Sequence, residues 1–183
     1  MPDVTLLPPL VTGGLYVIVK YLSQTERVWT LYYHEGSVTS SYLIFPDVTY
    51  ERGNLHTVKK SPNTFGGWYV DHTEVYSMNS TSHFVIGCVH LGNISNSDIP
   101  VLNRDIRAFD AIVRNNVGHD PTESWALRVI QELLHSGVIR FANPHTQFHE
   151  VQPWIRWFVR RTLADVNLQN NIPRPVVHCD LFA

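Results

Sequence analysis

Ten histidines are the most unusual feature of this 183-residue chain. The unperturbed pKa of histidine lies near neutrality, so a histidine in a cleft can take up or release a proton at physiological pH. His83 and His90 stand at the two ends of an apolar run and could line such a cleft. The ten positions are His34, His56, His72, His83, His90, His119, His135, His145, His149 and His178.

Metal binding is the second chemistry that histidines support. His145 and His149 are four residues apart and would share one face of a helix, as zinc ligands can. Pro144 argues against a helix there, and no third ligand accompanies the pair. We therefore predict neither a metal site nor another cofactor.

Nucleophilic chemistry has little support in the sequence. There is no glycine-rich phosphate loop, no dinucleotide fingerprint, no Gly-x-Ser-x-Gly elbow and no His-Glu-x-x-His motif. Cys88 and Cys179 are too few for a disulfide framework or a cysteine zinc site. Each lies close to a histidine in sequence, His90 and His178 respectively, but adjacency alone does not give the geometry of a nucleophile and its base.

Aromatic side chains are abundant for a chain of this length, which favours a pocket for a small hydrophobic or aromatic ligand. Trp68 and Tyr69 follow Gly66-Gly67 and are expected on the rim of that pocket. Ordinary core packing is the alternative interpretation of the set. The predicted pocket residues are Trp29, Tyr32, Trp68, Tyr69, His83, His90 and Trp125.

Charge limits the class of partner. Lys and Arg number 14 and Asp and Glu 16, a formal charge of -2, so no global basic field would hold a nucleic acid. Residues 152–166 nevertheless combine Arg156, Arg160 and Arg161 with Trp154 and Trp157. That helix could touch RNA, a membrane surface or a partner, or its arginines could lie along its own apolar stripe.

The cellular setting is predicted from what the sequence lacks. The longest apolar runs are too short to cross a bilayer, and the first residues do not resemble a signal peptide. We expect a reduced, cytoplasmic protein with no transmembrane segment. A homodimer is left open.

The first half of the sequence has the period of strands. Alternating or continuous apolar residues predict strands at 15–22 and 28–34, joined as a hairpin, and a long strand at 83–91. Weaker candidates are 41–45, 55–59 and 67–70, with a Pro- and Gly-containing loop at 61–67.

The second half has the period of helices, at 99–115, 120–137 and 152–166. Asp120, Pro121 and Glu123 have the spacing of a helix start, and Gly137 that of a helix stop. Residues 138–142 are a candidate short strand and 170–183 an extended tail. This order predicts an α+β fold, an antiparallel sheet packed by helices, with domain residues 1–142 and a C-terminal helix and tail, 143–183, packed on them.

Five short motifs over residues 14–139 resemble those of a fungal family of small uncharacterised proteins. A Leu-Tyr-Val strand occurs at residues 15–17. The family's His-Trp-Ala-Leu corresponds to Val-Trp-Thr-Leu at 28–31, and its Tyr-His-Val or a similar motif to Leu-His-Thr-Val at 55–58. A long apolar strand follows at 83–91. The family's Asn-Cys helix start, with Trp shortly after, corresponds to Pro121, Thr122 and Trp125.

That family is similar to circularly permuted papain-like proteins of the NlpC and lecithin-retinol-acyltransferase types. The resemblance implies a base, a residue that orients it and a cysteine nucleophile at a helix N-terminus. In this chain the base position is Val28 and the nucleophile position is Thr122, so cysteine acyl chemistry would be lost. Only His56, at the orienting position, keeps an ionisable group. The catalytic candidates are therefore His56 and, more weakly, Thr122.

Three functions follow as hypotheses. The first is a cofactor-independent enzyme, a cyclase or isomerase of fungal secondary metabolism, which folds its substrate in an aromatic pocket and moves a proton through His56. The second is a non-catalytic binding module of degenerate papain-like fold, with its cleft filled by its own side chains. The third is a hydrolase or acyltransferase with a displaced nucleophile.

Overall fold

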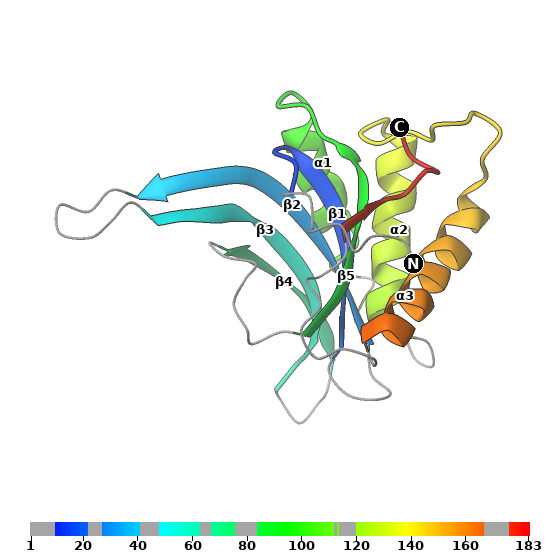
Figure 1. Cartoon of the computed structure of the whole chain (residues 1–183), viewed down its shortest axis with the longest axis horizontal. Coiled ribbons are helices and arrows are strands. Elements are labelled where there is room, and N and C mark those ends of the chain that lie inside the picture. Colours follow the sequence, from blue (N-terminus) through cyan, green and yellow to red (C-terminus); the bar gives the residue numbers. More distant parts are fainter. Residues whose placement is uncertain are drawn as a thin grey trace.

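A computed structural model describes residues 10–21, 27–40, 48–62, 67–75, 84–111, 113, 120–166 and 176–183. Six strands form one sheet in the order β4-β3-β2-β1-β5-β6 (Figure 1). Strands β1 to β5 pair antiparallel, and β6 joins β5 in parallel. The strands are β1 (Gly14–Tyr21), β2 (Arg27–Ser40), β3 (Val48–Lys60), β4 (Trp68–Val75), β5 (Phe84–Asn93) and β6 (Val176–His178).

Three α-helices cover one face of this sheet: α1 (Ile99–Ala108), α2 (Pro121–His135) and α3 (Val151–Val166), the last preceded by the short 3-10 helix η2 (Phe148–Glu150). The predicted α+β class, with an antiparallel sheet packed by helices and a C-terminal helix, is confirmed. No described helix is both long and apolar enough to cross a membrane.

Side-chain alternation gives the sheet two different faces. On the helix-facing side, Leu31 of β2 belongs to the main core, together with residues of all three helices. The other side carries a second buried cluster, in which Tyr16 and Tyr32 pack with Ile18 and Cys88. Neighbouring residues of one strand therefore contribute to opposite faces of the sheet, as Leu31 and Tyr32 do.

Several element boundaries differ from those predicted. Strands β2 and β3 are longer than expected, and their paired ends at 37–40 and 48–51 extend beyond β1 and β4 (left in Figure 1). Helix α1 ends at Ala108, because residues 109–111 form a turn, rather than continuing to residue 115. The predicted strand at 138–142 is wrong, since only Phe141 forms a bridge, to Phe182. The candidate strand at 41–45 lies outside the described residues.

The described part of the C-terminal segment packs on the same core as the sheet. Val151, Ile155 and Phe158 of α3 are buried in the main core, as are Cys179 and Phe182 beyond β6. Within the tail, three residues are extended as β6 and a turn follows at Asp180 and Leu181. The predicted helix 152–166 corresponds closely to α3.

Candidate functional site

Three side chains from separate elements form a hydrogen-bonded row on the helix-facing side of the sheet. His56 of β3 and His72 of β4 stand opposite each other in the strand register, with their Nδ1 atoms 2.8 Å apart. The Nε2 atom of His72 lies 3.0 Å from Oδ2 of Asp110, in the turn after α1. The sheet fixes the two imidazoles, and the end of α1 supplies the carboxylate.

The direction of the hydrogen bonds in this row follows from its ends. An ionised carboxylate can only accept, so Asp110 holds the Nε2–H of His72. The Nδ1 of a neutral His72 then carries a lone pair, which accepts the Nδ1–H of His56. This leaves a lone pair on Nε2 of His56, an atom that is buried and has no hydrogen-bond partner among the described residues. The row thus presents one free basic nitrogen to the protein interior.

The surroundings keep His56 uncharged at neutral pH. His56 is buried, with only 5% of its surface exposed. Burial first, and then electrostatic interaction with His72 and with Arg107, lowers the pKa of His56 to about 3.

Thr122 is placed for capping rather than for nucleophilic attack. Its Oγ1 accepts the backbone N–H of Trp29 at 3.0 Å and donates to Oδ1 of Asp120 at 2.7 Å. Asp120 also accepts the backbone N–H groups of Thr122 and Glu123, as the predicted N-cap of α2. No hydrogen bond joins Thr122 to His56, so His56 does not act as a base toward the Thr122 hydroxyl in this arrangement.

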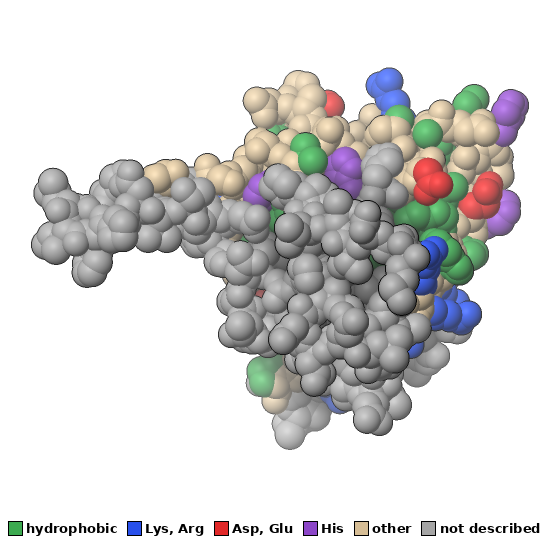
Figure 2. Space-filling view, viewed as in Figure 1, with side chains coloured by type: hydrophobic (Ala, Val, Ile, Leu, Met, Phe, Trp, Pro, Cys, Tyr) green, Lys and Arg blue, Asp and Glu red, His purple; other side chains and the backbone are tan. Residues whose placement is uncertain are grey.

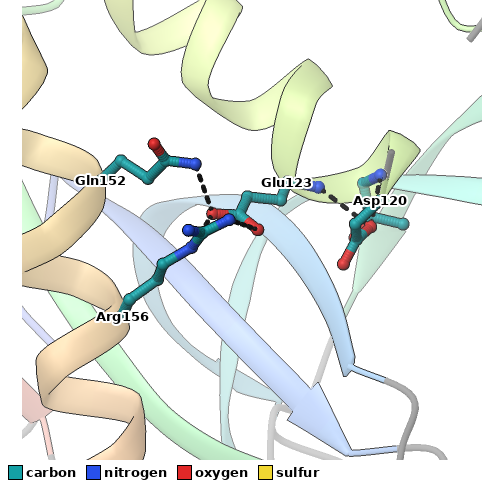
Figure 3. Close-up of polar contacts among 5 residues, drawn as sticks. Asp120, Glu123, Gln152 and Arg156 are labelled. Atoms are coloured by element: carbon teal, nitrogen blue, oxygen red, sulfur yellow. Dashed lines mark hydrogen bonds and ion pairs between the residues drawn. The ribbon is translucent and has the colours of Figure 1, made fainter. Parts of the chain in front are cut away.

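The start of α2 is also tied to α3. Figure 3 shows Arg156 reaching the carboxylate of Glu123 with two nitrogens, at 2.6 and 3.0 Å, while Gln152 donates to the same carboxylate at 2.9 Å. Glu123 is buried, and Asp120 beside it holds the helix cap. The network fixes the end of α2 that meets β2, and sequence spacing across the two helices gave no signal for it.

The predicted pocket residues are divided between the two faces of the sheet. Trp29 and Trp125 are buried in the main core, and Trp68 packs partly buried against it, on the side of His56. The indole Nε1 of Trp125 is buried and, like Nε2 of His56, has no hydrogen-bond partner in the described part of the chain.

The remaining pocket candidates lie on the opposite face or are not described. Tyr32 bonds Nδ1 of His34 through its hydroxyl at 3.0 Å, and the ring of His90 lies 5.0 Å from that of Tyr16. Tyr69 alternates with Trp68 and is 39% exposed. His83 lies outside the described residues.

The two cysteines are free and buried, Cys88 in the second cluster and Cys179 in the main core. Burial raises the pKa of the Cys179 thiol to about 12, so it is protonated at neutral pH and a poor nucleophile. The metal pair is not formed either, because His145 lies in a turn and His149 in η2, both exposed. No group of three metal-binding side chains occurs among the residues that are described.

The basic face of α3 is exposed. Figure 2 shows Lys and Arg side chains gathered beside apolar ones at the right of the view, where α3 lies. Trp157 is 54% exposed, and the guanidinium of Arg161 lies over its ring at 5.4 Å. Arg161 thus covers an aromatic ring of its own helix, whereas Arg156 is bound to Glu123.

Comparison with known proteins gives no match for this chain among family models, curated proteins or solved structures.

Proposed function

We propose that this protein is a cofactor-independent enzyme, of isomerase or cyclase type, that moves a proton on a small hydrophobic or aromatic substrate. The single observation that carries the proposal is the row His56–His72–Asp110, with the free Nε2 of His56 buried at its inner end. The fungal setting is taken from the sequence resemblance, and the cytoplasmic location from the absence of a signal-peptide pattern and from the two free cysteines.

The row explains how a histidine with a low pKa can act as a base. When Nε2 of His56 takes a proton from a substrate C–H bond, the Nδ1–H of His56 can pass to Nδ1 of His72. The positive charge then lies on His72, which faces the carboxylate of Asp110 at 3.0 Å. The buried ring of His56 is neutral before and after the step. Reversal of the relay delivers the proton to another carbon, which completes an isomerisation.

The experiment uses a substrate whose only chemistry is proton transfer. The protein is incubated with 3-cyclohexen-1-one, and conversion to the conjugated enone is followed by ultraviolet absorbance. In parallel, deuterium uptake from heavy water by 2-tetralone is followed by mass spectrometry. We expect His56→Asn to reduce both rates by about a hundredfold or more, in the range of general acid–base contributions.

A matched control is His135→Asn, since His135 is exposed in the last turn of α2. That variant should retain the wild-type rates. The proposal fails if the wild-type protein is no faster than imidazole buffer, or if folded His56→Asn, checked by near-ultraviolet circular dichroism, retains full activity.

A non-catalytic binding module is the second candidate, and a specific observation favours it. Trp29 is 3% exposed in the main core, and both hydrogen-bonding functions of Thr122 are occupied. In the resemblance, Thr122 is the lost nucleophile position, and Trp29 is next to Val28, the lost base position. An inert wild-type protein in the assays above would favour this candidate.

The third candidate, a hydrolase or acyltransferase, has less support, because Thr122 is engaged in the cap and Cys179 is a buried thiol. The permuted papain-like arrangement stays our proposal for the finer fold. It is supported by the meeting of the α2 N-terminus, at Thr122, with β2 at Trp29, the neighbour of Val28.

A further inference from the structure

The outward face of helix α3 combines an exposed tryptophan with arginines. The exposed residues in the described part of this helix recur three and four positions apart, which is the spacing of one helix face. They are Pro153, Arg156, Trp157, Arg160 and Arg161. On the other side of the helix, Val151, Ile155 and Phe158 are buried in the main core, and this packing fixes which face points outward.

Trp157 is held at the surface by its neighbours. It is 54% exposed, the largest fraction among the exposed large apolar side chains of the described residues. Its ring lies 6.2 Å from that of Trp154, which is in turn stacked on Phe158 of the core at 6.1 Å, and the guanidinium of Arg161 lies over it at 5.4 Å. Tryptophan is favoured at a boundary between water and an apolar phase, because its indole has an apolar body and a polar N–H.

The same face has an excess of positive charge. Residues 151–164 contain three arginines and no Asp or Glu. Arg156 is paired with Glu123 of α2, so Arg160 and Arg161 set the sign of the face. Since the chain as a whole has a formal charge of -2, this positive charge is a local feature of α3. A partner that complements the face is therefore anionic.

A membrane surface fits this face better than a nucleic acid does. Affinity for a nucleic acid grows with the number of phosphates that the protein neutralises, and two arginines neutralise few. A membrane with anionic lipids attracts the same arginines, and its interfacial region also takes up tryptophan. Figure 1 shows α3 at an outer edge of the fold, away from the paired ends of β2 and β3, so its exposed face points away from the sheet.

We propose that the outward face of α3 binds the surface of a membrane that contains anionic lipids. Trp157 enters the headgroup region, and Arg160 and Arg161 pair with the phosphate or carboxylate groups of the lipids. With one ring and two guanidinium groups, the binding is reversible and sensitive to salt. The inference is independent of the proposed catalysis, since none of these residues belongs to the row His56–His72–Asp110.

Vesicle sedimentation tests the inference with the full chain. The vesicles consist of phosphatidylcholine alone or with about 30% phosphatidylserine. We expect binding to the anionic vesicles to be at least about tenfold tighter, and this difference to disappear in about 0.5 M salt. Arg160→Gln combined with Arg161→Gln should weaken binding to the anionic vesicles by about tenfold or more, since each arginine near such a surface contributes about fivefold. Trp157→Ala should weaken it by about fivefold or more.

The matched control is Lys59→Gln combined with Lys60→Gln, which removes the same charge from an exposed part of β3. In the sheet, β2 and β1 separate β3 from β5, the strand that α3 contacts. This control should bind the anionic vesicles as the wild-type protein does. Equal weakening in the lysine and arginine variants would show that net charge alone acts, and would overturn the inference.

Quenching by brominated phosphatidylcholine, added to the anionic vesicles, reports on the ring itself. The wild-type protein should lose tryptophan fluorescence on binding, whereas Trp157→Phe, which keeps an apolar ring, should bind with little quenching. Equal quenching in both would assign the contact to another tryptophan and overturn the inference. It is also overturned if the wild-type protein does not bind the anionic vesicles, or binds labelled single-stranded RNA in their place.

Discussion

At the scale of single residues, Thr122 at the start of α2 accepts a hydrogen bond from the backbone of strand β2. The backbone N–H of Trp29 is buried and depends on Oγ1 of Thr122 for its hydrogen bond. Thr122→Ala should therefore reduce the free energy of unfolding by about 1–3 kcal/mol, the cost of an unpaired buried donor. Thr122→Ser, which keeps the hydroxyl, should lose less. Urea unfolding followed by fluorescence measures both variants.

The same substitution tests whether Thr122 has a catalytic role. Because its hydroxyl is engaged with Asp120 and Trp29, Thr122→Ala should leave the proposed activity of the folded protein within a few-fold. A loss beyond about a hundredfold, equivalent to roughly 2.7 kcal/mol of barrier, would instead show that Thr122 is a nucleophile or positions one.

His56 should make the stability of the protein depend on pH in a predictable direction. Its pKa is about 3 in the folded protein, below the ordinary histidine value of 6.5 that applies when the chain is unfolded. Between these values the unfolded chain binds more protons, so stability is fully present above about pH 6.5 and is lost as pH falls toward 3, by up to about 1.4 kcal/mol per pH unit.

Urea titrations at about pH 7 and about pH 5 test this dependence. His56→Gln should flatten it, because the variant has no group to titrate at this position. His135→Gln, which alters an exposed histidine, should keep the wild-type dependence. Parallel curves for wild type and His56→Gln would contradict the assignment of the low pKa to His56.

The sequence supported only part of the candidate site. His56 was selected through a resemblance, and His72 was one histidine among ten. The predicted loop at 61–67 is centred on residue 64, and a hairpin symmetric about that residue pairs position 56 with position 72, as the register does. Asp110 could not have been found this way, since its contact depends on where α1 stops and how that helix crosses the sheet.

At the scale of elements, local sequence was most informative where chain neighbours decide the structure. Helix α2 begins after the cap at Asp120 and ends before Gly137, which has a positive φ, much as predicted. Both features depend only on residues within one turn. The extra length of β2 and β3 comes from their pairing with each other. The apolar positions around Phe109 have helical spacing, yet the chain turns there, and spacing alone does not report a turn.

The contact between α2 and α3 should depend on one arginine. Glu123 is 11% exposed and receives two hydrogen bonds from Arg156, whose side chain is half exposed. Arg156→Met should therefore destabilise the protein by about 1–2 kcal/mol, less than for a fully buried pair because solvent screens the arginine. Arg160→Met, an exposed change on the same helix, should stay within about 0.5 kcal/mol. Urea unfolding measures the loss of stability in both variants. Equal losses in Arg156→Met and Arg160→Met would show that apolar packing, and not the Arg156–Glu123 pair, holds α3 against α2.

At the scale of the whole molecule, the main core joins segments that are distant in the sequence. The backbone N–H of Cys179 donates to the carbonyl of His90, and that of Ala183 to Arg140. The C-terminal residues therefore add the edge strand β6 beside β5 and contact the chain after α2 (Figure 1). Sequence periodicity could not predict these contacts, because it describes neighbours along the chain and not which strand pairs with which.

Phe182 tests whether residues 143–183 unfold together with the rest of the protein. It is 1% exposed, and its ring lies 5.4 Å from that of Phe141. Phe182→Ala should reduce the free energy of unfolding by about 3–5 kcal/mol, whereas Phe182→Leu should cost less than about 1.5 kcal/mol. Because the core is shared, the loss should lower the midpoint of one cooperative transition, seen alike by tryptophan fluorescence and far-ultraviolet circular dichroism. Two separate transitions, with only the one from residues 143–183 shifted, would show instead that those residues fold as a unit of their own on residues 1–142.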